Sequence, residues 1–130
     1  MKFLNKKKLG KTGEYGENAA ADYLAQIGYE IIGRNVICDG HEIDIIAKDI
    51  KYIVFVEVKT RTVYKGLSRF GSAASSVDKV KQRRIITAAK AYLKQTNHRR
   101  VPRYDIVEVY IDNNKIQRIN HIPRAFGSGR

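Results

Sequence analysis

The sequence is poor in cysteine and in long apolar runs, and each shortage excludes a class of protein. The single cysteine, Cys38, allows no internal disulfide and no zinc site built from cysteines. The longest apolar run, residues 53–56, is far shorter than the ~20 residues of a membrane-spanning helix. The first ten residues carry four lysines and lack the apolar stretch of a secretory signal. We therefore expect a cytoplasmic protein with no membrane partner.

Acidic residues are also scarce, at 13 against 25 Lys and Arg, which leaves a net charge of +12 over 130 residues. A domain this basic is a candidate for a polyanionic partner such as DNA. The charges are segregated, because residues 14–58 hold nine acids against three bases and residues 59–103 hold thirteen bases against one acid. This layout suits an acidic site between phosphate-binding surfaces. The alternative is that the basic segments are only solvated surfaces.

Hydrophobic periodicity predicts one helix and three strands in the first half of the chain. Ala20, Ala21, Leu24 and Ile27 recur at helical spacing, and Gly28 then stops the helix. The pair Asp39-Gly40 is typical of a two-residue hairpin turn between β-branched segments. The expected elements are a helix over residues 13–27 and a meander of strands over residues 29–38, 41–47 and 52–61.

The second half predicts a basic helix followed by a hairpin. Ser75-Ser76-Val77-Asp78 has the form of a capping box, so the helix should start near Ser76 and run to about Gln95. Strands are expected over residues 103–111 and 115–122, with a loose tail after Pro123. The predicted order is αβββαββ. Side chains expected to be buried on the helix are Ile85, Ala88, Ala89 and Tyr92.

Four basic residues of the second helix should form one surface ridge. Lys79, Arg83, Lys90 and Lys94 fall at i, i+4, i+11 and i+15. At 100° per residue they lie within about a 60° arc of the helix. We expect this basic ridge to bind the DNA backbone.

Two predicted strands bring carboxylates together. The strand over residues 52–61 changes from apolar to charged and presents Glu57, Lys59 and Arg61 on one face. If its hairpin with the preceding strand is symmetric, residues whose numbers sum to 101 face each other, so Asp44 opposes Glu57. Facing carboxylates about 5 Å apart at Cβ repel each other. A Mg²⁺ ion would compensate, since it takes one or two carboxylates and completes its shell with water and phosphate oxygens.

This arrangement favours phosphodiester hydrolysis, in which Lys59 would orient a water or stabilise charge on the scissile phosphate. The alternative is that Glu42 pairs with Lys59 across the strands while Asp44 and Glu57 are merely solvated. Glu17 lies on the apolar face of the first helix and should point toward the sheet. It either needs a polar partner where it is buried or forms a salt bridge near the first turn of the helix.

Other polar and aromatic residues favour structural interpretations. His41 beside the acidic strand is more often a turn residue than a metal ligand or general base. Tyr104 and Tyr110 are more often core or sheet-surface residues than base-stacking platforms. Cys38 is expected to be a small buried apolar residue.

The carboxylate motifs resemble those of the PD-(D/E)XK nuclease superfamily, although Ile43 stands where its signature has proline. The chain from Gly13 to Phe126 is most similar to the YraN-like family of predicted bacterial endonucleases, themselves similar to archaeal Holliday-junction resolvases. The resemblance implies a restriction-endonuclease-like α/β fold whose central mixed sheet is flanked by helices. The motifs that carry it are Gly16-Glu17, Gly40-His41-Glu42-Ile43-Asp44, Phe55-Val56-Glu57-Val58-Lys59-Thr60-Arg61, Gly28-Tyr29, Arg34-Asn35, Arg103-Tyr104-Asp105 and Ala125-Phe126.

The resemblance also implies roles for individual residues. Asp44 and Glu57 occupy the metal-ligand positions and Lys59 that of the catalytic lysine, with Mg²⁺ or Mn²⁺ as cofactor. Glu17 matches the helix carboxylate that supports a metal or its water, and Arg61 joins the basic ridge among the residues expected to contact nucleic acid.

The expected domain organisation is a basic flexible arm over residues 1–12, one nuclease-like domain over residues 13–126 and a flexible tail over residues 127–130. The leading hypothesis is a metal-dependent endonuclease that hydrolyses DNA, with branched or structured DNA among its expected substrates. The alternatives are a nucleic-acid-binding module that keeps the fold without turnover, and a small protein whose basic surface serves another assembly. Cutting both strands of a duplex would favour a two-fold homodimer.

Overall fold

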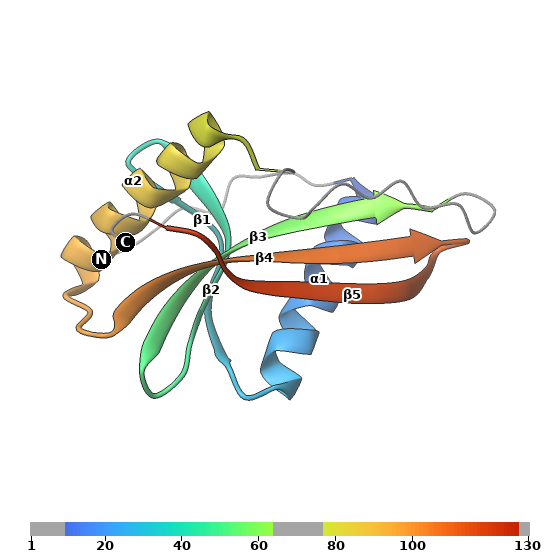
Figure 1. Cartoon of the computed structure of the whole chain (residues 1–130), viewed down its shortest axis with the longest axis horizontal. Coiled ribbons are helices and arrows are strands. Elements are labelled where there is room, and N and C mark those ends of the chain that lie inside the picture. Colours follow the sequence, from blue (N-terminus) through green and yellow to red (C-terminus); the bar gives the residue numbers. More distant parts are fainter. Residues whose placement is uncertain (1–9, 64–76, 128–130) are drawn as a thin grey trace.

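A five-stranded sheet in the order β1-β2-β3-β4-β5 is the centre of the computed structural model, which describes residues 10–63 and 77–127 (Figure 1). The order along the chain is αβββαββ, as predicted, and the topology matches that of restriction-endonuclease-like proteins. No helix in these two ranges is long and apolar enough to cross a membrane. The elements are α1 (Lys11–Gln26), β1 (Glu30–Cys38), β2 (His41–Lys48), β3 (Tyr52–Thr62), α2 (Lys79–Thr96), β4 (Val101–Asp112) and β5 (Lys115–Phe126).

The sheet is mixed. Strands β1, β2 and β3 form an antiparallel meander, β3 pairs with β4 in parallel, and β4 pairs with β5 antiparallel. A parallel pair needs a crossover connection, and α2 lies within the connection from β3 to β4. The predicted register of the second hairpin is confirmed over four pairs, from Ile45↔Val56 to Lys48↔Ile53, whose numbers all sum to 101.

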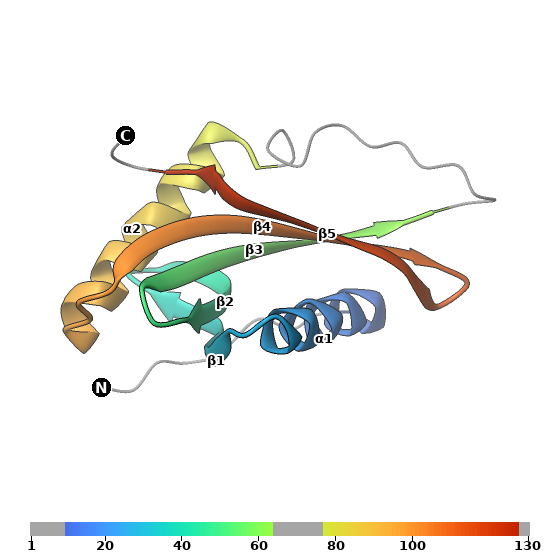
Figure 2. The ribbon, with the colours of Figure 1, turned by 60° about the horizontal axis from the view of Figure 1, so that its bottom comes forward.

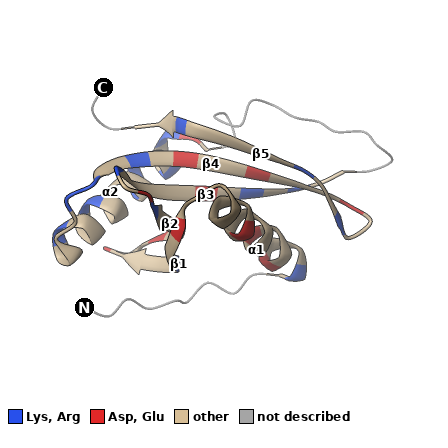
Figure 3. Ribbon diagram, turned by 90° about the horizontal axis from the view of Figure 1, so that it is seen from below, with Lys and Arg blue, Asp and Glu red and all other residues tan. Residues whose placement is uncertain are grey.

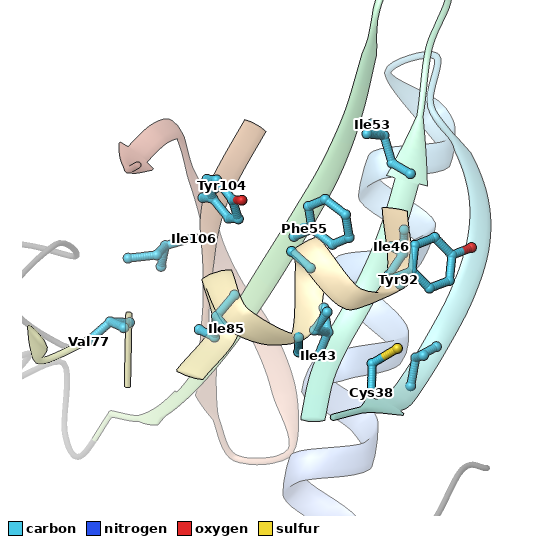
Figure 4. Close-up of a cluster of buried hydrophobic side chains, with 13 residues drawn as sticks. Cys38, Ile43, Ile46, Ile53, Phe55, Val77, Ile85, Tyr92, Tyr104 and Ile106 are labelled. Carbon is cyan, nitrogen blue, oxygen red and sulfur yellow. The ribbon is translucent and has the colours of Figure 1, made fainter. Parts of the chain in front are cut away.

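The two helices cover opposite faces of the sheet (Figure 2). Alternate residues of β3 belong to different apolar clusters, because Phe55 packs in the cluster beneath α2 (Figure 4) and Val56 in the cluster beneath α1. Burial on both faces explains why this strand begins as a continuous apolar run rather than an alternating one.

Helix α2 begins later than predicted. Asp78 is its N-cap, and the Asp78 carboxylate accepts a hydrogen bond from the backbone N–H of Lys81 at 2.8 Å. The expected start near Ser76 is therefore wrong, because the cap is Asp78, the last residue of the predicted capping box. Ser75 and Ser76 themselves lie outside the described residues. The four side chains expected to be buried on this helix are the four that are buried.

Helix α1 follows its predicted face, with one exception. Ala20, Ala21 and Leu24 are buried as expected, whereas Ile27 is 49% exposed. Ile27 is the C-cap, so its side chain no longer follows the helical face. The chain then turns at Gly28, whose φ of +105° suits glycine. The helix begins at Lys11, two residues inside the segment predicted as a basic arm, and the arm's residues 1–9 lie outside the described part.

Strand β5 continues to Phe126, so the loose tail expected after Pro123 is a wrong prediction. Proline is tolerated here because β5 is an edge strand with one hydrogen-bonding partner. The register shifts between Tyr104 and Ile106, and Arg124 takes a φ of +54° in this region. The shift lets the Phe126 ring stack on Tyr104 with centroids 5.5 Å apart, which holds the strand end against the core.

Candidate active site

The pairing of β2 with β3 stops where the two carboxylates begin. Ile45↔Val56 is the last pair of this ladder, although both strands continue beyond it, and the next position holds Asp44 and Glu57. The Asp44 carboxylate accepts a hydrogen bond from the backbone N–H of Val58 at 2.8 Å. A side-chain oxygen of β2 therefore satisfies a ladder donor of β3, and the strands open at this point.

The side chains of β2 also switch faces of the sheet at Asp44. Ile43 packs in the cluster beneath α2 and Ile45 in the cluster beneath α1, whereas residues two apart in a regular strand share a face. The facing position on β1 is Asn35, between the pairs Arg34↔Ile45 and Val36↔Ile43, and its φ is +50°. Asparagine tolerates this left-handed conformation better than most residues. The irregular backbone on both strands thus supports the placement of Asp44.

Glu57 is buried among charges of both signs. Its side chain is 3% exposed, and its Oε2 lies 2.7 Å from Nζ of Lys81 and 3.6 Å from Nζ of Lys59. Burial first, and then the negative charge of Asp44, raise the pKa of Glu57 to about 7 despite both lysines. Asp44 is buried to the same extent, at 3% exposed. The two carboxylates predicted to face each other are therefore electrostatically coupled.

The expectation that Asp44 and Glu57 are merely solvated is wrong, because both are buried. The cross-strand pair expected in that alternative is also replaced: Lys59 forms its ion pair with Glu57, and Glu42 accepts a hydrogen bond from Asn35 at 3.3 Å. Lys81 is a residue of this site that the sequence did not indicate. It belongs to α2, and no local pattern reports that the first turn of this helix lies over β3.

Glu17 is buried between α1 and the sheet, as predicted. It is 2% exposed, and Nη2 of Arg34 lies 3.4 Å from its Oε1. The preceding Gly16 is in close contact with β3, since a Cβ added there would lie 2.1 Å from Oγ1 of Thr60. Over residues 10–63 and 77–127, no group of three or more acidic, histidine or cysteine side chains is placed to hold a metal ion.

Another buried carboxylate, Glu108, lies on β4 beside Lys59 in the parallel register Lys59↔Glu108. Glu108 is 2% exposed, and its Oε1 accepts hydrogen bonds from Tyr110 and Asn120 at 2.7 and 3.0 Å. Its Oε2 lies 3.7 Å from Nη2 of Arg61. The sequence analysis missed Glu108, although a single acid within the apolar stretch of residues 106–111 is a signal that could have indicated it.

The predicted basic ridge lies on the exposed side of α2. Lys and Arg recur along this helix, while acidic residues mark α1, β2 and β4 (Figure 3). Lys81 is not part of this ridge: at 100° per residue it lies on roughly the opposite side of the helix, where it contacts Glu57. All four ridge residues are exposed: Lys79, Arg83, Lys90 and Lys94.

The remaining candidates are placed as the structural interpretations expected. Tyr104 and Tyr110 are 4% and 2% exposed, so they are core residues. Cys38 is 3% exposed, and its Sγ lies 3.6 Å from Oε1 of Gln95. His41 is the first residue of β2 and pairs with Cys38 across the hairpin turn. There Asp39 and Gly40 both have positive φ, as the predicted turn requires.

Comparison with known proteins shows full-length similarity to one family. The model of the family described as "Uncharacterised protein family UPF0102" matches residues 16–109. A UPF0102 protein of Caldanaerobacter subterraneus subsp. tengcongensis is 43% identical over 129 residues, which cover 97% of this chain and 100% of the relative. A UPF0102 protein of Geobacter metallireducens is 42% identical over 115 residues, covering 88% of this chain and 90% of that protein.

Proposed function

The chain belongs to the uncharacterised protein family UPF0102, and we propose that it is a divalent-metal-dependent endonuclease that hydrolyses phosphodiester bonds of DNA. One observation carries the proposal: Asp44 and Glu57 are both buried, at 3% exposed, where β2 and β3 open, with Lys59 beside them. Two coupled carboxylates in a buried site are unfavourable for folding alone. A site that binds a cation explains why they are held together.

The side chains present suit Mg²⁺ or Mn²⁺. Both carboxylates supply hard oxygen ligands, and Mg²⁺ commonly binds through one or two carboxylates plus water and phosphate oxygens. The raised pKa of Glu57, about 7, supports this fit because it reflects burial next to Asp44, a cost that a bound cation would offset. We propose Asp44 and Glu57 as the ligands. A metal held there would polarise the scissile phosphate and acidify a bound water.

The surrounding residues of the chain have separate roles in this proposal. Lys59 keeps its ammonium group 3.6 Å from Glu57, close enough to orient the attacking water or to stabilise negative charge on the phosphate. Asp44 is held by the backbone N–H of Val58, which limits its freedom before substrate arrives. Glu17 supports the site from α1, where Arg34 is its ion-pair partner.

The proposed substrate is DNA because of the charge that surrounds the site. The net charge is +12, and α2, whose first turn contacts Glu57 through Lys81, carries the basic ridge on its exposed side. Phosphate contacts from such a ridge supply affinity that does not depend on sequence. The resemblance to PD-(D/E)XK nucleases, and within them to the YraN-like family and to Holliday-junction resolvases, extends the proposed substrates to branched DNA. A homodimer would place two such sites on opposite strands.

The decisive test is incubation of the purified protein with linear duplex, single-stranded, flapped and four-way-junction DNA, with EDTA, Mg²⁺ or Mn²⁺. Cleavage should require the metal. Asp44→Asn, Glu57→Gln and Lys59→Ala should each abolish it while DNA binding is largely retained, because these residues act on the reacting phosphate and the ridge binds. Glu30→Gln is the matched control, since that side chain is 70% exposed on β1.

Two outcomes would contradict the proposal. Cleavage that survives in all three site variants would show that the reaction occurs elsewhere or comes from a contaminant. DNA binding without cleavage under either metal would favour the alternative, a nucleic-acid-binding module that keeps the nuclease fold.

A further inference from the structure

Glu57 has a cationic partner that the proposed reaction leaves without a role. Lys81 comes from α2, on the far side of a long connection from β3, and its Nζ lies 2.7 Å from Oε2 of Glu57. This ion pair is shorter than that of Lys59, at 3.6 Å. The two partners differ in exposure, because the Lys81 side chain is 44% exposed and that of Glu57 is 3% exposed. Lys81 therefore bridges the buried carboxylate and the protein surface.

The position of Lys81 in its helix is electrostatically unusual. The first turn of α2 contains no acidic residue and holds both Lys79 and Lys81, at the end where the helix dipole favours negative charge. Asp78 caps this turn by accepting the backbone N–H of Lys81, which leaves the ammonium group to Glu57. A phosphate at the start of this helix would balance the same charge.

Lys81 and a divalent cation would compete for the negative charge of Glu57. A cation would lie at roughly 2.0 to 2.6 Å from its carboxylate ligands, and Nζ of Lys81 is already 2.7 Å from Oε2. Repulsion between the two cations would drive the more mobile one away. Lysine is a compact charge on a flexible stem, and this one is half exposed, so it can swing toward solvent without moving the helix.

We propose that Lys81 exchanges partners, neutralising Glu57 in the metal-free protein and binding a phosphate of DNA once a divalent cation occupies Glu57. This inference rests on the proposed function, because it takes Glu57 to be a metal ligand and DNA to be the partner. The inference adds Lys81 as a phosphate-binding residue whose ion-pair partner changes when a metal binds. Metal and DNA then strengthen each other's binding, since the metal releases Lys81 and the DNA gives it a new anion.

The first test compares the binding of Mn²⁺ alone to wild type, Lys81→Met and Lys79→Met by calorimetry. Both variants lose one positive charge from the same turn of α2, but Lys79 forms no ion pair with the residues that the structure describes. Lys81→Met should bind Mn²⁺ at least about fivefold more tightly than Lys79→Met, because its competitor on Glu57 is gone. The backbone cap from Asp78 is kept in both variants, and Lys81→Gln repeats the test with a polar side chain.

The second test measures affinity for a short labelled DNA duplex in EDTA and in Ca²⁺, another cation that prefers oxygen ligands. Wild type should gain affinity on addition of Ca²⁺, and Lys81→Met should lose most of that gain. Lys79→Met should weaken binding by the same factor in both conditions, since its charge faces DNA with or without metal.

The outcomes separate the two proposals. Equal Mn²⁺ affinity in Lys81→Met and Lys79→Met would overturn the partner exchange, while Mn²⁺ binding by wild type would leave the proposed function intact. An equal gain in DNA affinity from Ca²⁺ in wild type and Lys81→Met would overturn the partner exchange as well. Wild type that binds no divalent cation would overturn both.

Discussion

At the scale of single residues, Glu57 is the group whose chemistry depends most on its surroundings. An exposed glutamate titrates near pH 4.5, whereas burial and the charge of Asp44 raise the pKa of Glu57 to about 7. Two lysines in contact with the carboxylate do not reverse this shift. The metal-free protein thus holds a carboxyl group that keeps its proton to a higher pH than an ordinary glutamate does, and a metal ligand must lose that proton.

The raised pKa of Glu57 predicts how stability changes with pH in EDTA. The folded state holds this proton more tightly than the unfolded state, so protonation of Glu57 stabilises the fold. This contribution to the free energy of unfolding is complete below about pH 4.5 and is lost as pH rises through about 7. The free energy of unfolding should fall by roughly 3 kcal/mol across that window on this account, since each pKa unit corresponds to about 1.4 kcal/mol. Urea unfolding of wild type and Glu57→Gln from pH 4 to pH 8 measures the difference.

In Glu57→Gln this part of the pH dependence should be absent, and above pH 7 the variant should be at least as stable as wild type in EDTA. Saturating Mn²⁺ should reverse that order, because a ligand that binds the folded state alone stabilises it by about 2.7 kcal/mol at a hundredfold excess over Kd. Parallel pH curves for the two proteins would show that Glu57 titrates normally.

At the scale of elements, the contact between α1 and β3 holds Glu17 against the sheet. Gly16 allows this close approach because its missing side chain leaves room for Thr60. A glycine within a helix normally costs about 1 kcal/mol relative to alanine. We infer that the close packing of α1 on β3 at this position offsets the cost of the glycine.

Gly16→Ala should therefore destabilise the protein, against the usual preference of helices for alanine. The added Cβ would lie 2.1 Å from Oγ1 of Thr60, and overpacking of this kind costs about 1 to 3 kcal/mol. Thr60→Ala removes Oγ1 and Cγ2, so the double variant should recover part of the loss. A double-mutant cycle by urea unfolding measures the coupling, and additive effects would show that α1 does not press on β3 at this point.

At the scale of the whole molecule, the segregated charge places a basic helix next to an acidic site. The ridge residues of α2 are exposed, while Asp44 and Glu57 are buried beside the first turn of that helix. The positive charge of α2 would attract DNA toward this part of the molecule, whereas the carboxylates by themselves repel a phosphate. Long-range attraction of this kind is screened by salt.

Replacing Arg83 and Lys90 together with alanine should weaken DNA binding and flatten its salt dependence. Each phosphate neutralised on a duplex contributes about −0.9 to the slope of log K against log[salt], so the slope should become shallower by about 2 if each residue binds one phosphate. Lys11→Ala with Lys115→Ala removes the same charge from exposed positions off the ridge and should leave the slope nearly unchanged. Equal effects of the two pairs would place the DNA elsewhere.

Much of the fold was predictable because its signals are local. The pair Asp39-Gly40 adopts positive φ at both residues as its turn requires, and the hairpin register that brings Asp44 to Glu57 follows from the short bend after β2. The predictions failed at element ends. Ile27, the start of α2 and the strand beyond Pro123 depend on a cap or on Phe126 packing against Tyr104, which periodicity does not record.

By itself, the sequence determined the elements, the antiparallel hairpins, the buried faces of both helices and the hairpin register that brings Asp44 near Glu57, because these follow from contacts within a few residues or across a short turn. Only the tertiary structure decided that β4 lies parallel to β3 with Glu108 beside Lys59, and that Lys81 reaches Glu57. Those contacts join segments about 20 to 50 positions apart. Their geometry is set by the packing of the helix on the sheet, which no short-range sequence pattern predicts.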